Sequence, residues 1–291
     1  MDPLDPDLPS VMTKRAFAEQ ARNLAKKAAV GPMNTGDKIV VCGAGGFIGG
    51  HLVASLRWQG YRNLRAVDIK PQSEWYQCFS DVENLVLDLQ DRANCYRALS
   101  DARYVYNFAA DMGGMGFVEN NRALCMLSGL INTHLLLAAR DVGVERFFFA
   151  SSACFYNAEK QKSPDVIPLR EEDAYPAMPE DGYGWEKLFS ERMCRHFRGD
   201  FGVQTRVARF HNVYGPHGKW DGGREKAPAA ICRKVIQAKL SGVHEIEVWG
   251  DGTRTRSFMY IDDCLKGVQM ITESDILEPI NLGSNELVTV N

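Results

Sequence analysis

The segment Asp37-Lys-Ile-Val-Val-Cys-Gly-Ala-Gly-Gly-Phe-Ile-Gly-Gly50 is the strongest indication of the fold in this 291-residue chain. Its apolar first part predicts a buried β-strand, and the apolar pattern that continues to Leu56 predicts a helix. Glycines between a strand and a helix allow a tight turn and bring backbone N–H groups near a pyrophosphate. The dipole of the helix N-terminus also favours phosphates. We therefore expect a dinucleotide to contact Gly43, Gly46, Phe47, Ile48 and Gly49.

A second apolar strand ends on a carboxylate, Asp68, 25 residues after Gly43. An acid at this position accepts hydrogen bonds from a ribose hydroxyl and repels a 2′-phosphate, so the pattern predicts NAD as the cofactor, not NADP. Asp88, which closes Leu85-Val-Leu-Asp88, is expected to contact the adenine. Strand, glycines, helix and acid in this register form a specific signal for a dinucleotide site.

Strand and helix patterns alternate from Lys38 onward, which is typical of a parallel sheet with right-handed crossovers. We predict an α/β fold, a Rossmann-like doubly wound parallel sheet with a smaller C-terminal substrate-binding lobe. Residues 257–262 are expected to return to the central sheet as a strand. We expect residues 1–36 to be an N-terminal extension without an assigned function. The NAD-binding domain is expected at residues 37–213 and 255–270, and the lobe at residues 214–254 and 271–291.

The composition is ordinary for a globular protein, with 45% hydrophobic and 24% charged residues. The net charge of −3 gives no reason to expect nucleic acid or an anionic membrane surface as a partner. Eight cysteines occur without a Cys-x-x-Cys spacing, which favours thiols in a reducing compartment over a disulfide framework or a zinc site. We therefore expect a cytoplasmic protein that holds no metal and binds neither nucleic acid nor a membrane.

Tyr183 and Lys187 lie four residues apart in Tyr-Gly-Trp-Glu-Lys, so a helix would place them on one face, toward one ligand. A phenol normally has a pKa of about 10. The Lys187 ammonium and an oxidised nicotinamide would both favour the phenolate, which predicts that Tyr183 and Lys187 serve the cofactor and the reaction together. Ser152, where an apolar strand ends, is expected to hydrogen-bond the same substrate hydroxyl. A solvated helix face is the alternative interpretation of Tyr183 and Lys187.

The glycine motif, Ser152, Tyr183 and Lys187 together resemble the extended short-chain dehydrogenase/reductase family, whose members mostly act on nucleotide sugars. The resemblance runs from Lys38 to Asn291. Five stretches are similar to the GDP-mannose 3,5-epimerase group of that family, among them Ala-Asp-Met-Gly-Gly-Met-Gly-Phe and Gly-Gly-Arg-Glu-Lys-Ala-Pro-Ala-Ala; they lie at residues 110–117, 151–156, 209–216, 222–230 and 249–258. Enzymes of that group continue past the position of Asn291, so we expect a lobe that is truncated at its C-terminus. Arg254 stands where the plant enzymes carry a glutamine.

The resemblance implies a transient oxidation. Tyr183 would take the proton of the C4 hydroxyl of GDP-mannose while NAD accepts the hydride. The 4-keto group would then acidify C3 and C5, and Cys154 and Lys226 would remove and return protons from opposite faces before C4 is reduced again. The resemblance also implies a homodimer through helices at residues 121–142 and 184–198. The substrate contacts that it implies are Gly113, Ser152, Ala153, Cys154, Asn212, Glu225, Lys226, Ala227, Lys234, Arg254, Thr255 and Arg256.

Several alternatives stay open at this level. Cys154 can also be interpreted as a small buried apolar residue, as most free cysteines are. Lys226, Lys234 and Arg256 can also be interpreted as ordinary surface cations. Among functions, the alternatives are a sugar-nucleotide 4-epimerase, a 4,6-dehydratase and a catalytically silent NAD-binding protein. A 4-epimerase needs no second proton carrier, a dehydratase calls for a glutamate near position 154, and a silent protein would be expected to lack part of the Ser152, Tyr183 and Lys187 set.

Overall fold

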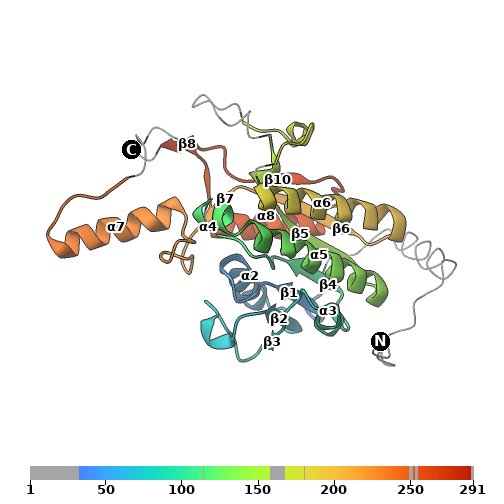
Figure 1. The fold of residues 1–291 in the computed structure, drawn as a ribbon. Helices are drawn as coiled ribbons and strands as arrows, with labels where there is room; N and C mark the ends of the chain where they lie inside the picture. The colour runs from blue at the N-terminus through green and yellow to red at the C-terminus, as the bar shows by residue number, and fades with distance from the viewer. Residues whose placement is uncertain are drawn as a thin grey trace, which may run out of the picture.

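Seven parallel strands form the central sheet of the computed structural model, in the order β10-β6-β5-β4-β1-β2-β3 (Figure 1). The chain starts at the centre, builds outward through β2 and β3, and then crosses to β4 on the other side of β1. Ligands of doubly wound sheets bind at such a reversal, outside the carboxyl ends of the strands. The expected fold class is therefore confirmed. The strands are Ile39–Cys42 (β1), Leu64–Asp68 (β2), Glu83–Val86 (β3), Tyr104–Asn107 (β4), Arg146–Ser152 (β5), Thr205–Phe210 (β6) and Ile280–Leu282 (β10).

The structure describes residues 33–113, 115–157, 168–179, 181–248, 252 and 255–289. Most of the expected N-terminal extension and Arg254 lie outside the described residues. Short elements connect the strands and carry parts of the site; they are the 3-10 turns Gln72–Glu74 (η1), Ala153–Phe155 (η2) and Glu171–Ala174 (η4) and the helix Met115–Asn120 (α4).

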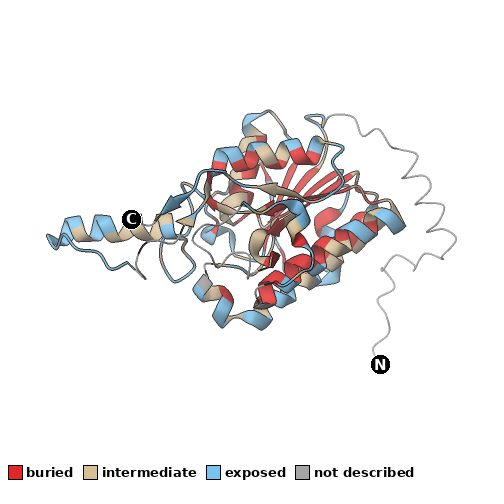
Figure 2. Cartoon of the chain, turned by 90° about the horizontal axis from the view of Figure 1, so that it is seen from above, coloured by how far each residue is buried: buried red, intermediate tan, exposed pale blue. Residues whose placement is uncertain are grey.

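Helices cover both faces of the sheet, and apolar side chains from each layer fill the space between. One face packs against Arg92–Leu99 (α3), Arg122–Val142 (α5) and Asp181–Phe201 (α6), and the other against Phe47–Trp58 (α2) and Ile261–Glu273 (α8). Successive residues of β1 enter the two clusters in alternation, so the strand is buried on both faces. A continuous apolar run is what such a strand requires. Figure 2 shows the buried residues on the strands and on the inward faces of these helices.

Helix α5 is, within the described part of the chain, the one helix that is long and apolar enough to cross a membrane by length and composition. Its best 18-residue window has a mean hydropathy of 1.3, and half of that window is buried inside the protein. Most of its buried apolar side chains belong to the core cluster that α5 shares with α3 and α6. Packing of this kind accounts for the apolar composition of α5 as that of a core helix.

The expected strand at residues 257–262 does not join the central sheet, so that prediction is wrong. Phe258–Tyr260 (β9) pairs with Asn212–Tyr214 (β7) in a separate two-stranded parallel sheet. The edge of β6 is taken instead by β10, with Ile280 opposite Ala208. The central sheet therefore offers β9 no edge there, and β9 pairs with the short strand that follows β6 in the chain.

The lobe extends from the carboxyl end of the sheet. Helix Ala227–Ser241 (α7) projects away from the sheet (Figure 1), and none of its residues is buried. A small antiparallel pair, Thr255–Arg256 (β8) with Val288–Thr289 (β11), lies in the same lobe. The segment that connects β7 to α7 ends at Lys226, the residue that precedes α7.

Candidate active site

The glycine loop after β1 leaves no room for a side chain at two positions. Gly43 has φ = 80°, and a Cβ there would lie 2.8 Å from the backbone nitrogen of Ala109. A Cβ on Gly49 would lie 2.3 Å from the carbonyl oxygen of Gly43. Gly46 caps α2, so the first N–H groups of that helix face the space beyond the loop. These residues fit a dinucleotide, because backbone donors and a helix N-terminus can approach a pyrophosphate without obstruction.

Two carboxylates follow β2 and β3 at the same end of the sheet. Asp68 is buried; its Oδ2 accepts a hydrogen bond from Gly45 N (3.0 Å) and its Oδ1 one from Lys70 N (3.0 Å). These backbone donors orient the carboxylate. Asp88 Oδ1 accepts from Gln90 N (2.8 Å). Both acids border the space in front of the glycine loop, where the ribose and adenine of a dinucleotide are expected.

One cleft of about 3110 Å³ joins this space to the lobe. Its volume is several times the ~300–1,000 Å³ of a typical small-molecule site, so two extended ligands can lie in it side by side. The structure brings to this cleft every predicted site residue that it describes; these are Gly43, Gly46, Phe47, Ile48, Gly49, Asp68, Asp88, Gly113, Ser152, Ala153, Cys154, Tyr183, Lys187, Asn212, Glu225, Lys226, Ala227, Lys234, Thr255 and Arg256. Arg254 lies outside the described residues.

Tyr183 and Ser152 meet at the floor of the cleft. A hydrogen bond joins their side chains, and Ser152 Oγ also accepts from the backbone nitrogen of Cys154 (3.2 Å). Burial raises the pKa of Tyr183 well above its usual value, the nearby Cys154 and Glu186 raise it further, and the bond from Ser152 opposes them. Our expectation that Lys187 would favour the phenolate therefore needs correction. Among the protein's own groups, the burial of Tyr183 raises its pKa more than the Lys187 ammonium lowers it.

Lys187 is buried beneath the same two residues. Its Nζ lies 4.9 Å from the centroid of the Phe149 ring and 5.5 Å from that of Tyr183. Glu186 Oε2 approaches the ammonium to 3.6 Å and offsets part of its charge. Tyr183 and Lys187 are both less than a tenth exposed, so the alternative of a solvated helix face is excluded.

Cys154 and Lys226 reach the cleft from different elements. Cys154 is half-buried in η2, directly after β5, whereas Lys226 caps α7. Lys226 Nζ donates to Asn212 Oδ1 (3.4 Å). Burial lowers the pKa of Lys226, and its electrostatic interaction with Cys154 opposes the shift. The two groups therefore lie close enough to interact across the cleft, and the partial burial of Lys226 argues against an ordinary surface cation.

The other cations of the lobe are more exposed. Lys234 Nζ donates to Glu247 O (2.6 Å), and Arg256 Nη1 donates to Thr255 O (2.9 Å). Both side chains border the cleft, and Glu225 is held by an ion pair with Arg233 (3.1 Å). No group of three or more His, Cys, Asp and Glu side chains suited to a metal occurs among the residues described.

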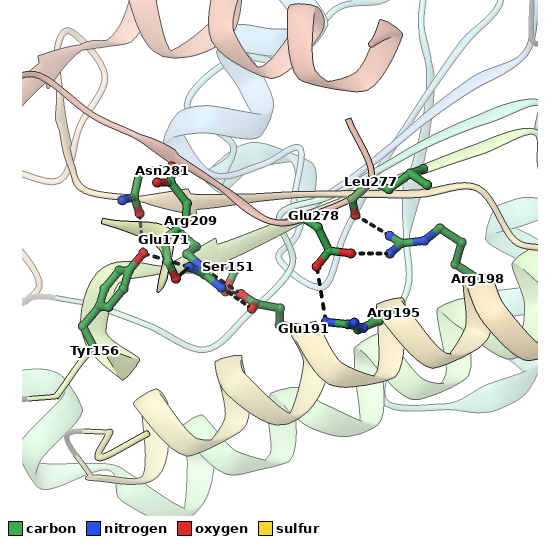
Figure 3. Close-up of polar contacts among 10 residues, drawn as sticks. All are labelled: Ser151, Tyr156, Glu171, Glu191, Arg195, Arg198, Arg209, Leu277, Glu278 and Asn281. Atoms are coloured by element: carbon green, nitrogen blue, oxygen red, sulfur yellow. Dashed lines mark hydrogen bonds and ion pairs between the residues drawn. The ribbon is translucent and has the colours of Figure 1, made fainter. Parts of the chain in front are cut away.

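A buried polar network lies behind the turn that carries Ser152 and Cys154 (Figure 3). Arg209, on β6, forms a two-pronged ion pair with Glu191 of α6: Nη2 to Oε1 at 2.7 Å and Nε to Oε2 at 3.1 Å. Ser151 Oγ donates to Glu191 Oε2 (3.2 Å), and Arg209 Nη1 donates to the Tyr156 hydroxyl (2.8 Å). The network thus holds the turn on both sides of Ser152 and Cys154, at Ser151 and at Tyr156.

Sequence reasoning missed this network and Arg224, which also borders the cleft. One signal was available: Arg209 lies inside an apolar strand pattern, where a charge requires a buried partner. That signal does not identify the partner, because Glu191 and Tyr156 lie far from Arg209 in the chain. For Arg224, the sequence shows only a basic loop.

The model of the NAD dependent epimerase/dehydratase family matches residues 39–283. Over 255 residues the chain is 45% identical to GDP-mannose 3,5-epimerase of Arabidopsis thaliana and 46% identical to GDP-mannose 3,5-epimerase 1 of Oryza sativa subsp. indica. Each match covers 87% of this chain and 66% of the relative, so the chain spans slightly less than two thirds of the length of these relatives.

Solved structures share the fold. UDP-glucose 4-epimerase from Thermotoga maritima, solved with UDP-glucose, has a TM-score of 0.76 at 24% identity, over 87% of this chain and 79% of that one. MoeE5, solved with UDP-glucose and NAD, has a TM-score of 0.67 at 30% identity, over 87% of this chain and 78% of that one.

Proposed function

Because the chain belongs to the NAD-dependent epimerase/dehydratase family, we propose that it epimerises GDP-mannose at C3 and C5, to GDP-L-galactose and GDP-L-gulose. The proposal rests on one observation: residues suited to two different kinds of reaction line the same cleft. Ser152, Tyr183 and Lys187 suit the oxidation of a hydroxyl, whereas Cys154 and Lys226 suit proton transfer at carbon. Identity of 45% and 46% to relatives named GDP-mannose 3,5-epimerase supports the substrate.

The first step is proton removal from the C4 hydroxyl. NAD, when bound along the glycine loop and Asp68, supplies the hydride acceptor and a positive charge near the reacting carbon. Tyr183 takes the hydroxyl proton, and Ser152, already bonded to the phenol, orients the sugar oxygen. Lys187 lies beneath the tyrosine ring, where its ammonium stabilises negative charge that develops on the phenol.

The second step is inversion at carbon. A 4-keto sugar has acidic hydrogens at C3 and C5, because either carbanion is an enolate. Cys154 and Lys226 approach from η2 and from the start of α7, so one removes a proton and the other returns one to the opposite face. Burial brings the pKa of Lys226 down toward neutral pH, which is where general acid–base catalysis is most efficient. Tyr183 would finally return its proton to the C4 oxygen as the hydride taken up in the first step comes back to C4, so that no net oxidation results.

The substrate's diphosphate is proposed to bind beside the lobe cations. Lys234 and Arg256 border the cleft, and their present partners are backbone carbonyl oxygens rather than carboxylates. A diphosphate offers them charge-assisted bonds that are stronger than those to a neutral carbonyl.

Deuterium exchange tests this proposal. The purified chain, loaded with NAD, is incubated with GDP-mannose in D₂O, and the sugar's C3 and C5 positions are followed by NMR. We expect deuterium at both carbons together with the inverted sugars. Cys154→Ser and Lys226→Met should each lose most inversion while still binding NAD. A chain that binds NAD and converts GDP-mannose only at C4, or leaves it without exchange, would refute the proposed reaction.

We also propose a homodimer through α5 and α6. The two helices pack against each other (Figure 1), and a Cβ added to Gly129 of α5 would lie 3.9 Å from Phe189 Cδ1 of α6. Their outer surface exposes a group of large apolar side chains, at 42–54% of their area; these are Met126, Leu127, Leu130, Trp185 and Phe189. Apolar patches of this kind mark interfaces.

Light scattering tests the dimer. The wild-type chain should have twice the monomer mass, and Trp185→Glu should have the monomer mass. The control is Trp58→Glu, because Trp58 is 90% exposed on α2, away from this surface. A wild-type monomer, or a dimer that survives Trp185→Glu, would refute this interface.

A further inference from the structure

Three consecutive side chains fix the loop that carries Lys226, and each is bound to a different element. Arg224 lies with its guanidinium carbon 3.7 Å from the centroid of the Phe117 ring on α4. Glu225 pairs with Arg233 of α7 (3.1 Å). Lys226 bonds to Asn212 of β7 (3.4 Å). The Glu225 contact lies within the lobe, and the Lys226 contact joins the loop to β7, which follows β6 of the central sheet. Among the contacts of the described residues, that of Arg224 with Phe117 ties the loop to the segment that follows β4.

The Arg224 side chain fits closely against that segment. A Cβ on Gly113 would lie 3.0 Å from Arg224 Cγ and 2.8 Å from Phe117 Cβ. The stem of Arg224 therefore lies on bare backbone at Gly113, where any side chain would displace it. Asp111, two residues earlier, is half-buried, and the charge of Arg224 lies close enough to act on it. The Phe117 ring thus holds the guanidinium over α4, with the Asp111 carboxylate near enough to interact with its charge.

The Phe117 ring connects Arg224 to the catalytic side of the cleft. Phe117 packs in one apolar cluster with Tyr183 and Cys154. The cation stacked on this ring is two residues from Lys226. Besides the bond from Lys226 to Asn212, two contacts therefore connect the Lys226 loop to Cys154: Arg224 on Phe117, and Phe117 against the cluster.

We propose that Arg224 is a positioning residue, which holds the Lys226 ammonium opposite Cys154 by clamping residues 222–226 onto Phe117. The inference rests on the proposed function, in which Lys226 exchanges protons with the sugar. Arg224 does not itself take part in proton transfer. Loss of Arg224 leaves Tyr183 and Cys154 in place, and of the pair Cys154 and Lys226 it releases only Lys226.

Exchange in two genetic backgrounds tests this role. In Cys154→Ala, the remaining deuterium exchange into GDP-mannose at saturating substrate depends on Lys226. Adding Arg224→Met should lower that exchange about tenfold or more, since small misplacement of a catalytic group is costly. In Lys226→Met, the remaining exchange depends on Cys154, and adding Arg224→Met should leave it unchanged. Arg224→Lys, which keeps a cation over the ring, should restore part of the loss.

Two outcomes of that experiment would overturn the proposal. Equal losses in both backgrounds would show that Arg224 acts on the whole site and not through Lys226. A higher KM for GDP-mannose, with unchanged exchange at saturation, would make Arg224 a substrate ligand.

A measurement without substrate separates this inference from the proposed function. Lysines are labelled by reductive ¹³C-methylation, the Lys226 signal is assigned by its loss in Lys226→Arg, and its pH titration is followed by NMR. Phe117→Leu removes the ring without changing the charge, and it should move the pKa of Lys226 up toward that of a solvated lysine. Arg224→Met should do the same. An unchanged titration in both variants would overturn the clamp. A wild-type chain without any exchange would refute the proposed reaction, and this titration would still decide the role of Arg224.

Discussion

Replacing Arg209 with methionine should lower the free energy of unfolding by about 3–5 kcal/mol. The Arg209 and Glu191 side chains are only 4% and 3% exposed, so neither charge is solvated. Arg209 also donates to the Tyr156 hydroxyl and to Glu171 O, at 2.8 Å each. Methionine fills most of the volume but leaves the Glu191 carboxylate buried with the Ser151 hydroxyl as its remaining donor. An uncompensated buried charge of this kind accounts for the expected magnitude.

A double variant separates the cost of the orphaned charge from that of lost packing. Arg209→Met with Glu191→Met removes both charges, so the pair should cost far less than the sum of the two single variants. Arg195→Met serves as the matched control on the same helix as Glu191 (Figure 3). Its ion pair with Glu278, at 3.3 Å, is 51% and 62% exposed, and its loss should cost at most about 1 kcal/mol.

Equilibrium unfolding in urea, followed by circular dichroism, measures these differences. The dependence of free energy on urea concentration should be unchanged, because the same surface is exposed on unfolding in each variant. If Arg209→Met costs no more than Arg195→Met, the carboxylate of Glu191 is either solvated or neutral. That result would refute the reasoning.

Three further outcomes follow from the site. Gly49→Ala should abolish NAD binding by calorimetry, because its Cβ would lie 2.3 Å from Gly43 O, whereas Gly199→Ala, whose Cβ meets no atom within 4 Å, should bind normally. Asp68→Ala should reduce the preference for NAD over NADP about tenfold or more in a fluorescence titration, because it removes a charged acceptor for the ribose. Lys226→Met should raise the free energy of unfolding in urea at pH 7. Burial lowers the folded pKa of Lys226 below its unfolded value of about 10.4. In the wild-type protein, burying the charged Lys226 ammonium therefore destabilises the fold fully below the folded pKa. This destabilisation disappears as the pH rises to the unfolded pKa, so the greater stability of Lys226→Met should vanish by about pH 10.

The parts of the fold that the sequence predicted correctly depend on neighbours in the chain. The strand, the glycine loop and α2 follow one another directly, and Tyr183 and Lys187 are one helical turn apart. Local patterns of this kind reflect the structure because the interacting groups lie within a few residues. Strand β9 shows what such local patterns cannot predict. Its residues have a strand pattern, but its partner depends on which sheet edge remains open, and β10 occupies that edge.

In the site, too, the sequence predicted features that depend on nearby residues and missed those that depend on distant ones. The residues that the motifs identified lie in one cleft, although their chemical roles stay predictions. The pKa of Tyr183 did not follow from its spacing to Lys187, because the burial that raises it comes from elements distant in the chain. Arg209 and Arg224 were not assigned for a related reason: their partners Glu191 and Phe117 are reached only through the folded structure.

The environments of Arg209 and Arg224 predict different consequences of removing them. Arg209 is buried in a two-pronged pair, so its loss should appear first as lost stability. Arg224 is exposed and stacked on a ring, a contact worth about 0.5–1 kcal/mol at such a site. Its loss should barely change the unfolding free energy. Because the Lys226 loop has no other contact with Phe117's cluster among those identified, the loss should instead appear in proton exchange. A variant of Arg224 that unfolds as readily as Arg209→Met would therefore contradict the distinction between a residue that stabilises the fold and one that positions a catalytic group.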